Sequence, residues 1–440
     1  MNNTILPPGY NVFQSIGRTL KQIKDPIGTM EESMRIYNGT YTVNLGLKRL
    51  IATQNPGFIE HVLRVNQRNY FKSEMLTEHL GRFLGKGLLT SNGDYWLRQR
   101  RLIQPGFHID RLKDLYLIMK RTIDEFLSKM QTGLNVDVYP LMHSLAFELV
   151  INTLFNVTIP GQVRKQLSTF ITETQGFVMK DIRQPHKSWW FRLNGELKKN
   201  LIYAQEVRTI IKNMIDQRMA AGRQFNDLLD MLLDARYEDS GLGMQEEQII
   251  DEILVLLIAG HETTANALSF TLYLLANHQH ELERLRETTK NVGFHESIKN
   301  ANILAAINES MRLYPPAWIS DRVAVDDDVY DQFKIPKDTI IAVFYYGLHR
   351  DPRYWNNPLE FKPGRFLNAA TEKDKIRAFY PFGSGPRLCI GNNFALAEMT
   401  LFLHSFIHMF DIWATGQTPQ LKPLVTLRPD RVLLKIKSRE

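Results

Sequence analysis

The sequence predicts a mainly α-helical fold with small β-sheets. From Leu112 to about Gln217, apolar residues recur at spacings of three and four, which is the pattern of helices that bury one face. The segment from Gln245 to about Leu275 reads as one long helix. Short runs of β-forming residues lie near both ends of the chain, at 40–46, 48–53, 424–427 and 432–436.

The composition is that of an ordinary globular protein. Of 440 residues, 44% are hydrophobic and 23% are charged. The 54 basic and 47 acidic residues give a net charge of +7 that is scattered along the sequence. Nucleic-acid binding is therefore not indicated, whereas a basic face for an acidic protein partner is consistent with the excess. A single cysteine excludes internal disulfides and fits a reducing compartment, so we expect a cytoplasmic protein.

The N-terminal 35 residues read as an irregular lead and a short helix, without an apolar run of signal-peptide or anchor length. The longest apolar stretch, around Ile253 to Gly260, is too short to span a bilayer. We therefore expect no membrane anchor. Because the sequence shows no repeat or linker, we predict one domain over residues 1–440, with a small β-rich part built from about 35–55, 320–345 and 420–437.

Two helices are predicted before Leu112. Asn55-Pro56 opens the first, which continues to about Val65 and has proline in its first turn. The second begins at Gly93, and in it Trp96 and Arg100 are four residues apart and share a face. A half-buried tryptophan beside a solvated arginine is the ordinary interpretation of such a pair.

The centre of the long helix carries polar residues, Ala259-Gly260-His261-Glu262-Thr263-Thr264. The hydroxyl of Thr263 can bond back to the carbonyl of Ala259, which bends or widens a helix and leaves a gap. Such a gap beside a hydroxyl and a carboxylate could hold dioxygen and relay protons to it. The alternative is a solvated polar face, but both flanks are apolar nearly all round, so a buried acid there is costly unless it is used or paired.

Two further features have bland interpretations when taken alone. Residues 176–194 break the helical rhythm, and their paired tryptophans, Trp189 and Trp190, are more often packing residues than ligand contacts. Glu309 and Arg312 are three residues apart on a helix that two prolines end. As a surface pair they would contribute only a few tenths of a kcal/mol.

The only cysteine, Cys389, lies in the loop from Phe382 to Gly391, where a glycine-rich segment meets a run of good helix formers. A lone cysteine is usually a small buried hydrophobe. Here the glycines let a flat group approach the backbone, and the start of a helix favours a thiolate over a thiol. One sulfur cannot complete a zinc or iron–sulfur site, so the metal would arrive with most of its ligands, as heme iron does.

This loop resembles the heme-binding signature of the cytochrome P450 family. Every position of the signature is filled, by Phe382, Gly383, Gly385, Arg387, Cys389 and Gly391. The loop is not a dinucleotide fingerprint, because residue 388 is leucine where that motif needs glycine. The resemblance runs from about residue 30 to the end and rests on five ordered motifs. It implies the cytochrome P450 fold, with heme b between the long helix and the Cys389 loop.

The resemblance also implies roles for individual residues. Cys389 would be the iron ligand, and the other cofactor-binding residues would be Trp96, Arg100, Arg322, Phe382, Arg387 and Gly391. Glu262 and Thr263 would be the acid–alcohol pair that activates dioxygen. Glu309, Arg312 and Arg365 would form a buried structural network. The substrate pocket would include Leu256, Ala259, Ala317, Trp318 and Ile319, and residues 176–194 would belong to a mobile cover over its entrance.

The implied reaction inserts one oxygen atom of O2 into an organic substrate, by hydroxylation or oxidative O-dealkylation. Electrons from NAD(P)H would come through a separate ferredoxin or flavodoxin with its reductase. We expect a soluble, monomeric, bacterial-type member. The substrate is not readable: fatty acids, with Lys48 or Arg49 at a carboxylate, compete with terpenoids, steroids and aromatic compounds. A heme-thiolate peroxygenase or isomerase, and a non-enzymatic heme sensor, are the alternatives.

Overall fold

The computed structural model describes residues 5–45, 48–108, 112–156, 159–184, 187–222, 225–367 and 377–439. The chain divides into two compact units, each assembled from separate stretches of sequence. The first comprises Met1–Ser73, Asn308–Cys389 and Leu421–Arg428. The second comprises Glu74–Ile307, Ile390–Gln420 and Pro429–Glu440.

The first unit is built on a six-stranded sheet with the strand order β1-β2-β3-β9-β6-β4. Its strands are β1 (Gly9–Tyr10), β2 (Thr40–Leu45), β3 (Lys48–Thr53), β4 (Tyr70–Phe71), β6 (Ser320–Ala324) and β9 (Ile340–Val343). β2 and β3 form the antiparallel hairpin that the sequence predicts, with Thr40 opposite Thr53. β9 comes from far along the chain and pairs parallel with β3, with Leu50 opposite Ile340. β7 (Asp328–Tyr330) and β8 (Phe333–Ile335) form a separate ribbon.

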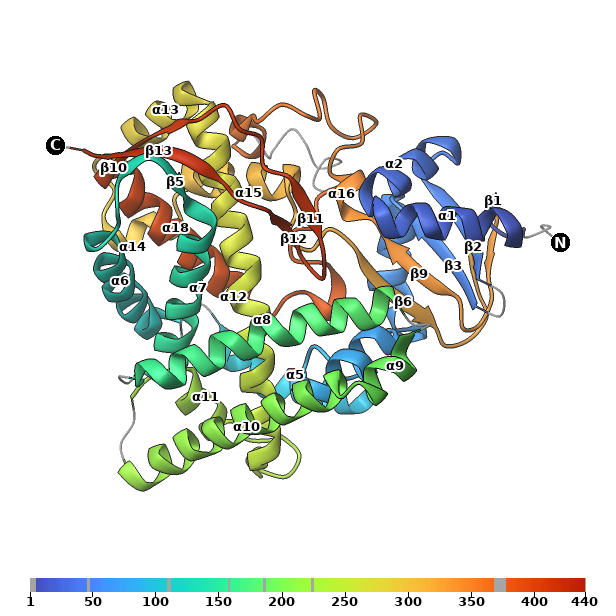
Figure 1. Cartoon of the computed structure of the whole chain (residues 1–440), viewed down its shortest axis with the longest axis horizontal. Helices are drawn as coiled ribbons and strands as arrows, with labels where there is room; N and C mark the ends of the chain where they lie inside the picture. The colour runs from blue at the N-terminus through green and yellow to red at the C-terminus, as the bar shows by residue number, and fades with distance from the viewer. Residues whose placement is uncertain are drawn as a thin grey trace. The chain divides into compact units, whose positions relative to one another are not determined.

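Short helices complete this unit. They are α1 (Val12–Lys24), α2 (Pro26–Ile36), α3 (Pro56–Glu60), the π-helix η1 (His61–Val65), the 3-10 helices η2 (Gln67–Asn69), η6 (Pro363–Phe366) and η8 (Gly385–Arg387), and α16 (Tyr345–Leu348). Figure 1 shows α1 and α2, in blue, against the β1, β2 and β3 end of the sheet. As predicted, Asn55 caps α3 by accepting from the Phe58 N–H, and Pro56 lies in the first turn. The last turn, however, is a π-helix, and it packs against η8.

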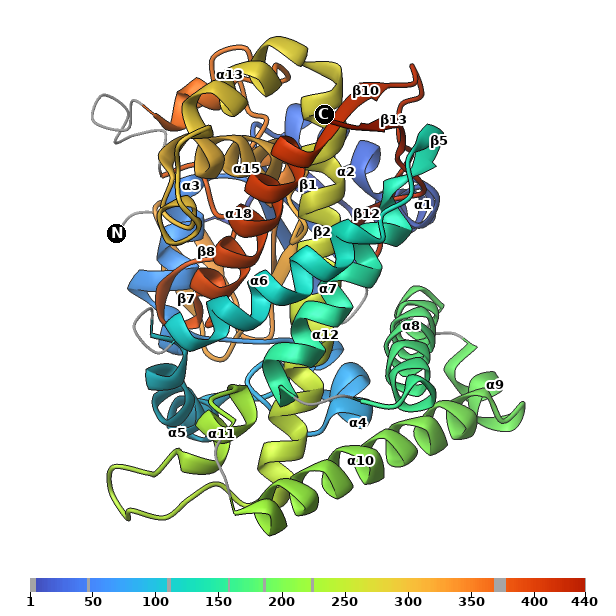
Figure 2. The ribbon, with the colours of Figure 1, turned by 90° about the vertical axis from the view of Figure 1, so that its left-hand side faces the viewer.

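The second unit is mainly helical. Its helices are η3 (Met75–Leu80), α4 (Gly81–Leu84), α5 (Gly93–Ile103), η4 (Gln104–Phe107), α6 (Lys113–Ser128), α7 (Val138–Phe155), α8 (Gly161–Arg183), α9 (Ser188–Leu193), α10 (Glu196–Ala221), α11 (Leu228–Asp234), α12 (Glu246–Asn277), α13 (Gln279–Thr289), α14 (Phe294–Ser297) and α18 (Asn392–Met409). Figure 2 shows α7 alongside α12, and α8 beside α10. α7 and α12 are long and apolar enough to cross a bilayer, but most of each helix is buried inside the protein.

The remaining elements extend both units. α15 (Ala301–Leu313) begins in the second unit and ends in the first. β11 (Leu421–Pro423) and β12 (Leu427–Pro429) form a two-stranded sheet, and β5 (Gly133–Asp137), β10 (Phe410–Ala414) and β13 (Leu433–Ser438) form a three-stranded one. The predicted mainly helical fold with small sheets is therefore confirmed. The prediction of a single domain stays a prediction.

Two local expectations were wrong. The region from Leu112 to Gln217 is not wholly helical, because β5 interrupts it and pairs with β13 at the far end of the chain. The helical rhythm also does not break at Gly176. α8 continues to Arg183, since Phe177 and Val178 lie on its buried face and outweigh the low helix propensity of one glycine. Pro185 and His186 lie outside the described residues.

Candidate active site

The loop that carries Cys389 is held by its own backbone. The Cys389 N–H donates to the Phe382 carbonyl at 3.0 Å, and the Leu388 N–H donates to the Gly385 carbonyl at 3.0 Å. Phe382 is half-buried, whereas the Cys389 side chain is exposed. α18 begins at Asn392, so the thiol lies just before the N-terminal end of a helix. An exposed cysteine in that position does not serve as a core hydrophobe, and the helix dipole favours its thiolate.

Glycines in this loop leave room on one side and close contact on the other. Gly385 has a φ of +70°, and a Cβ there would collide with the carbonyl oxygen of Leu63 on η1. Gly383 has a φ of +75°, and a Cβ on it or on Gly391 would meet no atom within 4 Å. The loop therefore packs tightly against η1 through Gly385 and has open space beside Cys389. A flat group such as heme fits this arrangement.

Two predicted cofactor-binding arginines, Arg322 and Arg387, lie together in the first unit. Burial, together with the positive charge of Arg322, lowers the pKa of Arg387 to about 9. Arg322 is in the middle of β6, opposite Ile341 of β9, and donates to the Asp321 carbonyl at 2.6 Å. Two neighbouring guanidinium groups repel each other, so a carboxylate placed between them would stabilise both. Heme carries two such carboxylates.

Glu309 is the centre of a buried ionic network in the first unit. Arg312 donates to both of its carboxylate oxygens, at 2.8 and 2.9 Å, and Arg365 donates to Oε1 at 2.9 Å. Glu309 and Arg312 have no exposed side-chain surface. Arg312 also donates to the carbonyls of His349 and Pro358, which ties α15 to two loops. The structure thus brings together the three residues that the sequence grouped.

α12 is buried all round except along one stripe. Between Ile249 and Leu272, the residues that are not buried are Leu256, Ala259, Gly260 and Thr263. Their spacing of three and four places them on a single helix face. The stripe contains the predicted residues Leu256, Ala259 and Thr263. Gly260 completes it, and only its spacing from Thr263 could have indicated that it faces the same way.

The polar residues around this stripe have distinct surroundings. Thr263 Oγ1 donates to the Ala259 carbonyl at 2.8 Å, as the sequence predicts, and Glu262 is buried. Thr264 points elsewhere and donates to Glu398 Oε2 on α18 at 3.1 Å. Glu398 is fully buried, and burial raises its pKa to about 8. Glu398 was not predicted as a site residue, because nothing in the sequence pattern of α18 distinguishes it from a surface acid.

A histidine pair braces the back of the same segment. His261 is fully buried, and its Nε2 lies 3.0 Å from Nδ1 and 3.1 Å from the carbonyl oxygen of His143 on α7. A Cβ on Gly260 would lie 3.2 Å from Val150, which is also on α7. α7 thus packs closely on the side of α12 that carries His261, while Thr263 lies two residues on, across the helix.

α5 carries the other two predicted cofactor-binding residues. Trp96 is buried, with 7% of its surface exposed, and Arg100 is half-buried one turn later. Arg100 Nε donates to Gln104 Oε1 at 3.1 Å. The two side chains share a helix face, as the sequence predicts.

The predicted pocket residues of the first unit differ from one another. Ala317 is exposed and Ile319 is half-buried, whereas Trp318 is buried in an apolar cluster and donates Nε1 to the Leu424 carbonyl at 3.0 Å. The indole packs edge-on against Phe344, with ring centroids 6.3 Å apart. Trp318 therefore packs in the apolar core of the first unit, and its predicted role in the substrate pocket stays a prediction.

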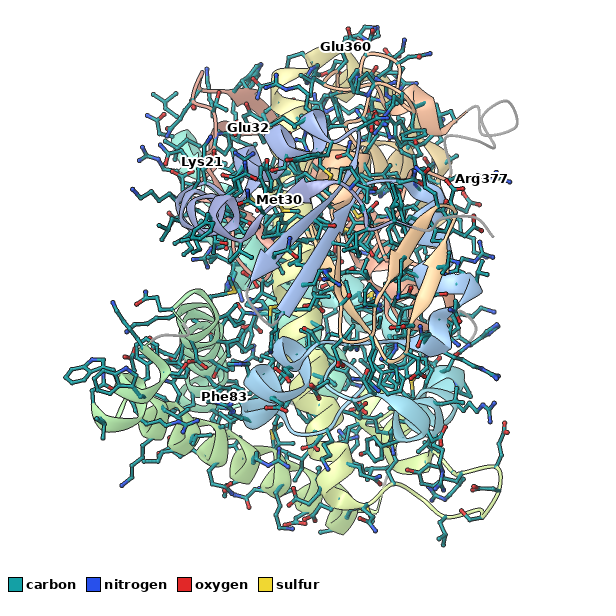
Figure 3. All side chains as sticks on the ribbon, turned by 90° about the vertical axis from the view of Figure 1, so that its right-hand side faces the viewer. Lys21, Met30, Glu32, Phe83, Glu360 and Arg377 are labelled. Carbon is teal, nitrogen blue, oxygen red and sulfur yellow. The ribbon has the colours of Figure 1, made fainter. Side chains whose placement is uncertain are left out.

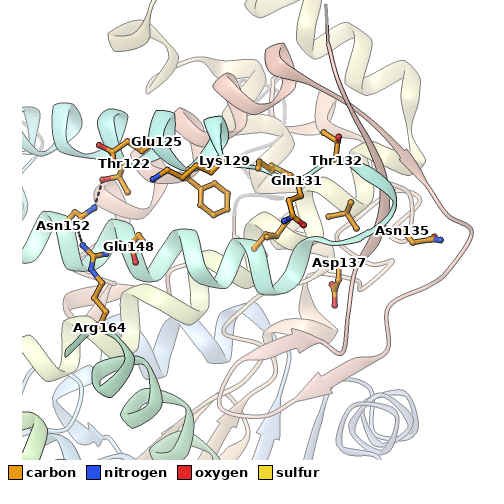
Figure 4. A pocket seen from close by; sticks show the side chains of 14 residues that line it. Thr122, Glu125, Lys129, Gln131, Thr132, Asn135, Asp137, Glu148, Asn152 and Arg164 are labelled. Atoms are coloured by element: carbon orange, nitrogen blue, oxygen red, sulfur yellow. Dashed lines mark hydrogen bonds and ion pairs between the residues drawn. The ribbon is translucent and has the colours of Figure 1, made fainter. Parts of the chain in front are cut away.

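A separate hollow of about 880 Å³ lies on the second unit, lined by residues of α6, α7, β5 and the start of α8 (Figure 4). Its walls mix acids, amides and cations. Asn152 donates to Thr122 at 3.0 Å, and Arg164 pairs with Glu148. None of the residues predicted for the active site lines it.

Comparison with known proteins shows the family of this chain. The model of the cytochrome P450 family matches residues 7–437. The chain belongs to the cytochrome P450 family. Cytochrome P450 132 of Mycobacterium bovis is 32% identical over 407 residues, which cover 87% of this chain and 86% of that protein. Cyclooctat-9-en-7-ol 5-monooxygenase of Streptomyces melanosporofaciens is 26% identical over 404 residues, which cover 88% and 85%.

Solved structures agree on the fold. The crystal structure of the cytochrome P450DA heme domain aligns with a TM-score of 0.86 and covers 99% of this chain and 98% of its own, at 22% sequence identity. Membership of the family makes this chain a cytochrome P450 monooxygenase that works with heme. The exposed thiol, the open glycines and the paired arginines fit that cofactor.

Proposed function

We propose that this cytochrome P450 hydroxylates or oxidatively dealkylates an apolar organic substrate, and that Cys389, Thr263 and Glu262 carry the reaction. The observation that carries the proposal is the exposed stripe on the otherwise buried α12, with a threonine hydroxyl at its end. When bound, heme supplies the iron at which dioxygen is reduced.

Cys389 supplies the thiolate ligand, which the N-terminal end of α18 favours. Phe382 and Gly391 flank it, and Gly391 leaves space for the flat face of the cofactor. Because the Cys389 N–H already donates to Phe382, the loop is fixed before any group binds. Arg322 and Arg387, together with Trp96 and Arg100 from α5, would hold the propionates of heme b.

Proton delivery would fall to Thr263 and Glu262. The Thr263 hydroxyl donates to Ala259, so its oxygen can accept a hydrogen bond from a group on the exposed stripe. Glu262, the residue before Thr263, is a buried acid and can hold or release a proton there. Leu256, Ala259, Ala317, Trp318 and Ile319 would supply apolar surface that excludes water from the reacting atoms.

Electrons would come from NAD(P)H through a separate ferredoxin or flavodoxin and its reductase. The net charge of +7 favours acidic partners. η1, which packs against the Cys389 loop, exposes Arg64 over 60% of its side chain. We place the working protein in the cytoplasm as a monomer. The Streptomyces relative is named for a reaction on cyclooctat-9-en-7-ol, so we propose a substrate with a large carbon skeleton.

Replacement of Thr263 by alanine tests the proposed proton delivery. With a reductase system and a turned-over substrate, T263A should form at least about tenfold less product per NAD(P)H consumed and release more peroxide. Thr271→Ala is the matched control, because Thr271 makes the same back-bond on α12, to Ala267 at 2.7 Å, but is buried away from the stripe. Equal product yields from T263A and the unaltered enzyme would contradict the proposal.

The same assay separates the alternatives. A peroxygenase or isomerase would turn over with peroxide, or with no oxidant, but not with O2 and a reductase system. A heme sensor would bind ligands without forming any product. Because family membership already indicates a monooxygenase, we expect neither result.

A further inference from the structure

One threonine of α12 does not bond within its own helix. Three of the four serine and threonine side chains on α12 donate to the carbonyl four residues back, namely Thr263, Ser269 and Thr271. This back-bond is the usual one for a helical hydroxyl, because that carbonyl is always within reach. Thr264 is the exception, since its Oγ1 donates to Glu398 Oε2 on α18 at 3.1 Å.

The contact with Thr264 is the one side-chain hydrogen bond of Glu398 within the described residues. Glu398 is fully buried, and no partner for its Oε1 occurs in the part of the chain that the structure describes. Burial raises the pKa of Glu398 to about 8, so the group is mainly an uncharged acid at neutral pH. An acid that leaves one buried oxygen unsatisfied is a costly way to fill a core. Packing alone therefore does not explain Glu398.

Gly260 supplies the carbonyl that Thr264 leaves free. It lies on the stripe of α12 that also carries Thr263, and a Cβ on it would lie 3.2 Å from Val150 of α7. Glycine is also the weakest helix former at this point of α12. If Thr264 turned to Gly260, hydroxyls would share two consecutive carbonyls, those of Ala259 and Gly260. Such sharing bends a helix, here at the turn that places Thr263.

We propose that Glu398 is a positioning residue for Thr263. By accepting the Thr264 hydroxyl, Glu398 keeps it away from the Gly260 carbonyl and so limits the bend of α12 at the stripe. The inference rests on the function proposed for Thr263 and adds no contact between Glu398 and substrate. The surroundings fit a fixed contact, because residues 264–272 are all buried, and side chains surround the pale yellow ribbon of α12 in Figure 3.

A proton relay through Glu398 fits these contacts less well. A relay needs a partner on each side of the acid, one to receive the proton from and one to pass it to. Glu398 Oε2 has Thr264, whereas Oε1 has no partner among the residues described. Thr264 is itself buried and lies off the stripe. The geometry therefore favours a role in positioning.

Paired substitutions test this role in the heme-loaded enzyme. Glu398→Leu removes the acceptor, so Thr264 should turn to Gly260, and product formed per NAD(P)H consumed should fall at least about fivefold. Valine has nearly the shape of threonine but no hydroxyl to turn. The double variant Glu398→Leu/Thr264→Val should therefore recover at least about half of the product yield of the unaltered enzyme. Glu398→Gln keeps an acceptor in place and should keep the full yield.

The crystal structure of heme-loaded Glu398→Leu gives a readout that does not depend on turnover. In it, Thr264 Oγ1 should lie within hydrogen-bond distance of the Gly260 carbonyl oxygen. The matched control is Thr400→Val, because Thr400 is an equally buried hydroxyl of α18 that bonds within α18, to the Leu396 carbonyl at 2.8 Å. This control should keep the full product yield. Glu398→Met replaces the leucine variant if that variant does not retain heme.

Three results would overturn the positioning role. They are a full product yield from Glu398→Leu while Thr263→Ala loses yield, a double variant that stays as poor as Glu398→Leu, and a Thr264 hydroxyl that does not turn to Gly260 in the crystal. A full yield from Thr263→Ala would instead contradict the function proposed for Thr263. The crystal structure would then still decide whether Glu398 keeps Thr264 away from Gly260.

Discussion

Glu309 shows how the surroundings of a residue decide what a charge pair contributes. On a helix surface, a glutamate and an arginine three residues apart stabilise the helix by a few tenths of a kcal/mol. Here the carboxylate receives three hydrogen bonds from two arginines and is withdrawn from water completely. Removing it would leave two buried cations without their anion, which is far more costly than losing a surface pair.

Glu309→Gln should therefore lower the free energy of unfolding by about 3–5 kcal/mol. Glu281→Gln is the matched control, because Glu281 pairs with Arg284 at the same spacing but is partly exposed. The control should change the free energy of unfolding by less than about 0.5 kcal/mol. Denaturant titration of both variants measures the difference. Similar losses in the two variants would show that burial does not set the strength of the Glu309 network.

At the scale of elements, two glycines of the Cys389 loop have opposite surroundings: one is closely packed and the other faces open space. Gly385 must be glycine because of its φ of +70° and its contact with η1, whereas Gly391 has a φ of −87° and open space where a Cβ would be. The protein fold alone thus explains the first glycine. The fold alone does not explain the second, and we propose that the bound cofactor uses the space beside it.

Alanine substitutions separate these two reasons. Gly385→Ala should destabilise the protein, by at least about 1 kcal/mol, since the backbone must shift away from Leu63. Gly391→Ala should leave the circular dichroism and the unfolding of the heme-free protein unchanged but reduce heme retention. Heme content per folded protein is the measurement. If Gly391→Ala kept its full heme content, the open space would not be where the cofactor lies.

Sequence patterns predicted some elements better than others. α12 was predicted nearly to its ends because its apolar run is long and continuous, and the β2–β3 hairpin was predicted because its two strands are adjacent. β5 was missed because its partner, β13, lies about 300 residues away, and no local pattern reports such pairing. The α12 stripe was found only in part, since which residues of a fully apolar helix stay uncovered depends on tertiary packing. The π-helical turn η1 has no sequence signal of its own.

At the scale of the whole molecule, stability should depend on two buried neutral histidines, one in each unit. Burial lowers the pKa of His261, beside His143, and of His349, beside Arg312, to about 3. The unfolded chain takes up these protons near pH 6.5, so between pH 6.5 and 3 it binds more protons than the folded protein. The stability contributed by each neutral histidine is complete above pH 6.5 and falls as the pH is lowered.

The unfolding free energy should therefore decrease steadily below pH 6.5, by at most about 5 kcal/mol for each histidine. His349→Gln keeps an acceptor for the Tyr380 N–H and removes one titrating group, so its acid dependence should be shallower. Chemical denaturation at a series of pH values measures both slopes. Identical slopes for the variant and the unaltered protein would mean that His349 is protonated in the folded state.

The family resemblance rests on sequence motifs. The motifs do not indicate the burial, packing or electrostatic surroundings of each site residue. Three features became visible only in the folded chain. They are the uncovered side of α12, the effect of the Arg322 charge on the pKa of Arg387, and the packing of Trp318 in an apolar core. The reaction assigned to these parts depends on the bond between the Cys389 sulfur and heme iron.

That bond is tested most directly by the absorption spectrum of the reduced protein with carbon monoxide. The unaltered protein should show the long-wavelength Soret maximum that a thiolate-ligated heme gives, and Cys389→His, folded by circular dichroism, should lose it. If the maximum never appears in the unaltered protein, or persists in the histidine variant, Cys389 is not the iron ligand and the account of this active site is wrong.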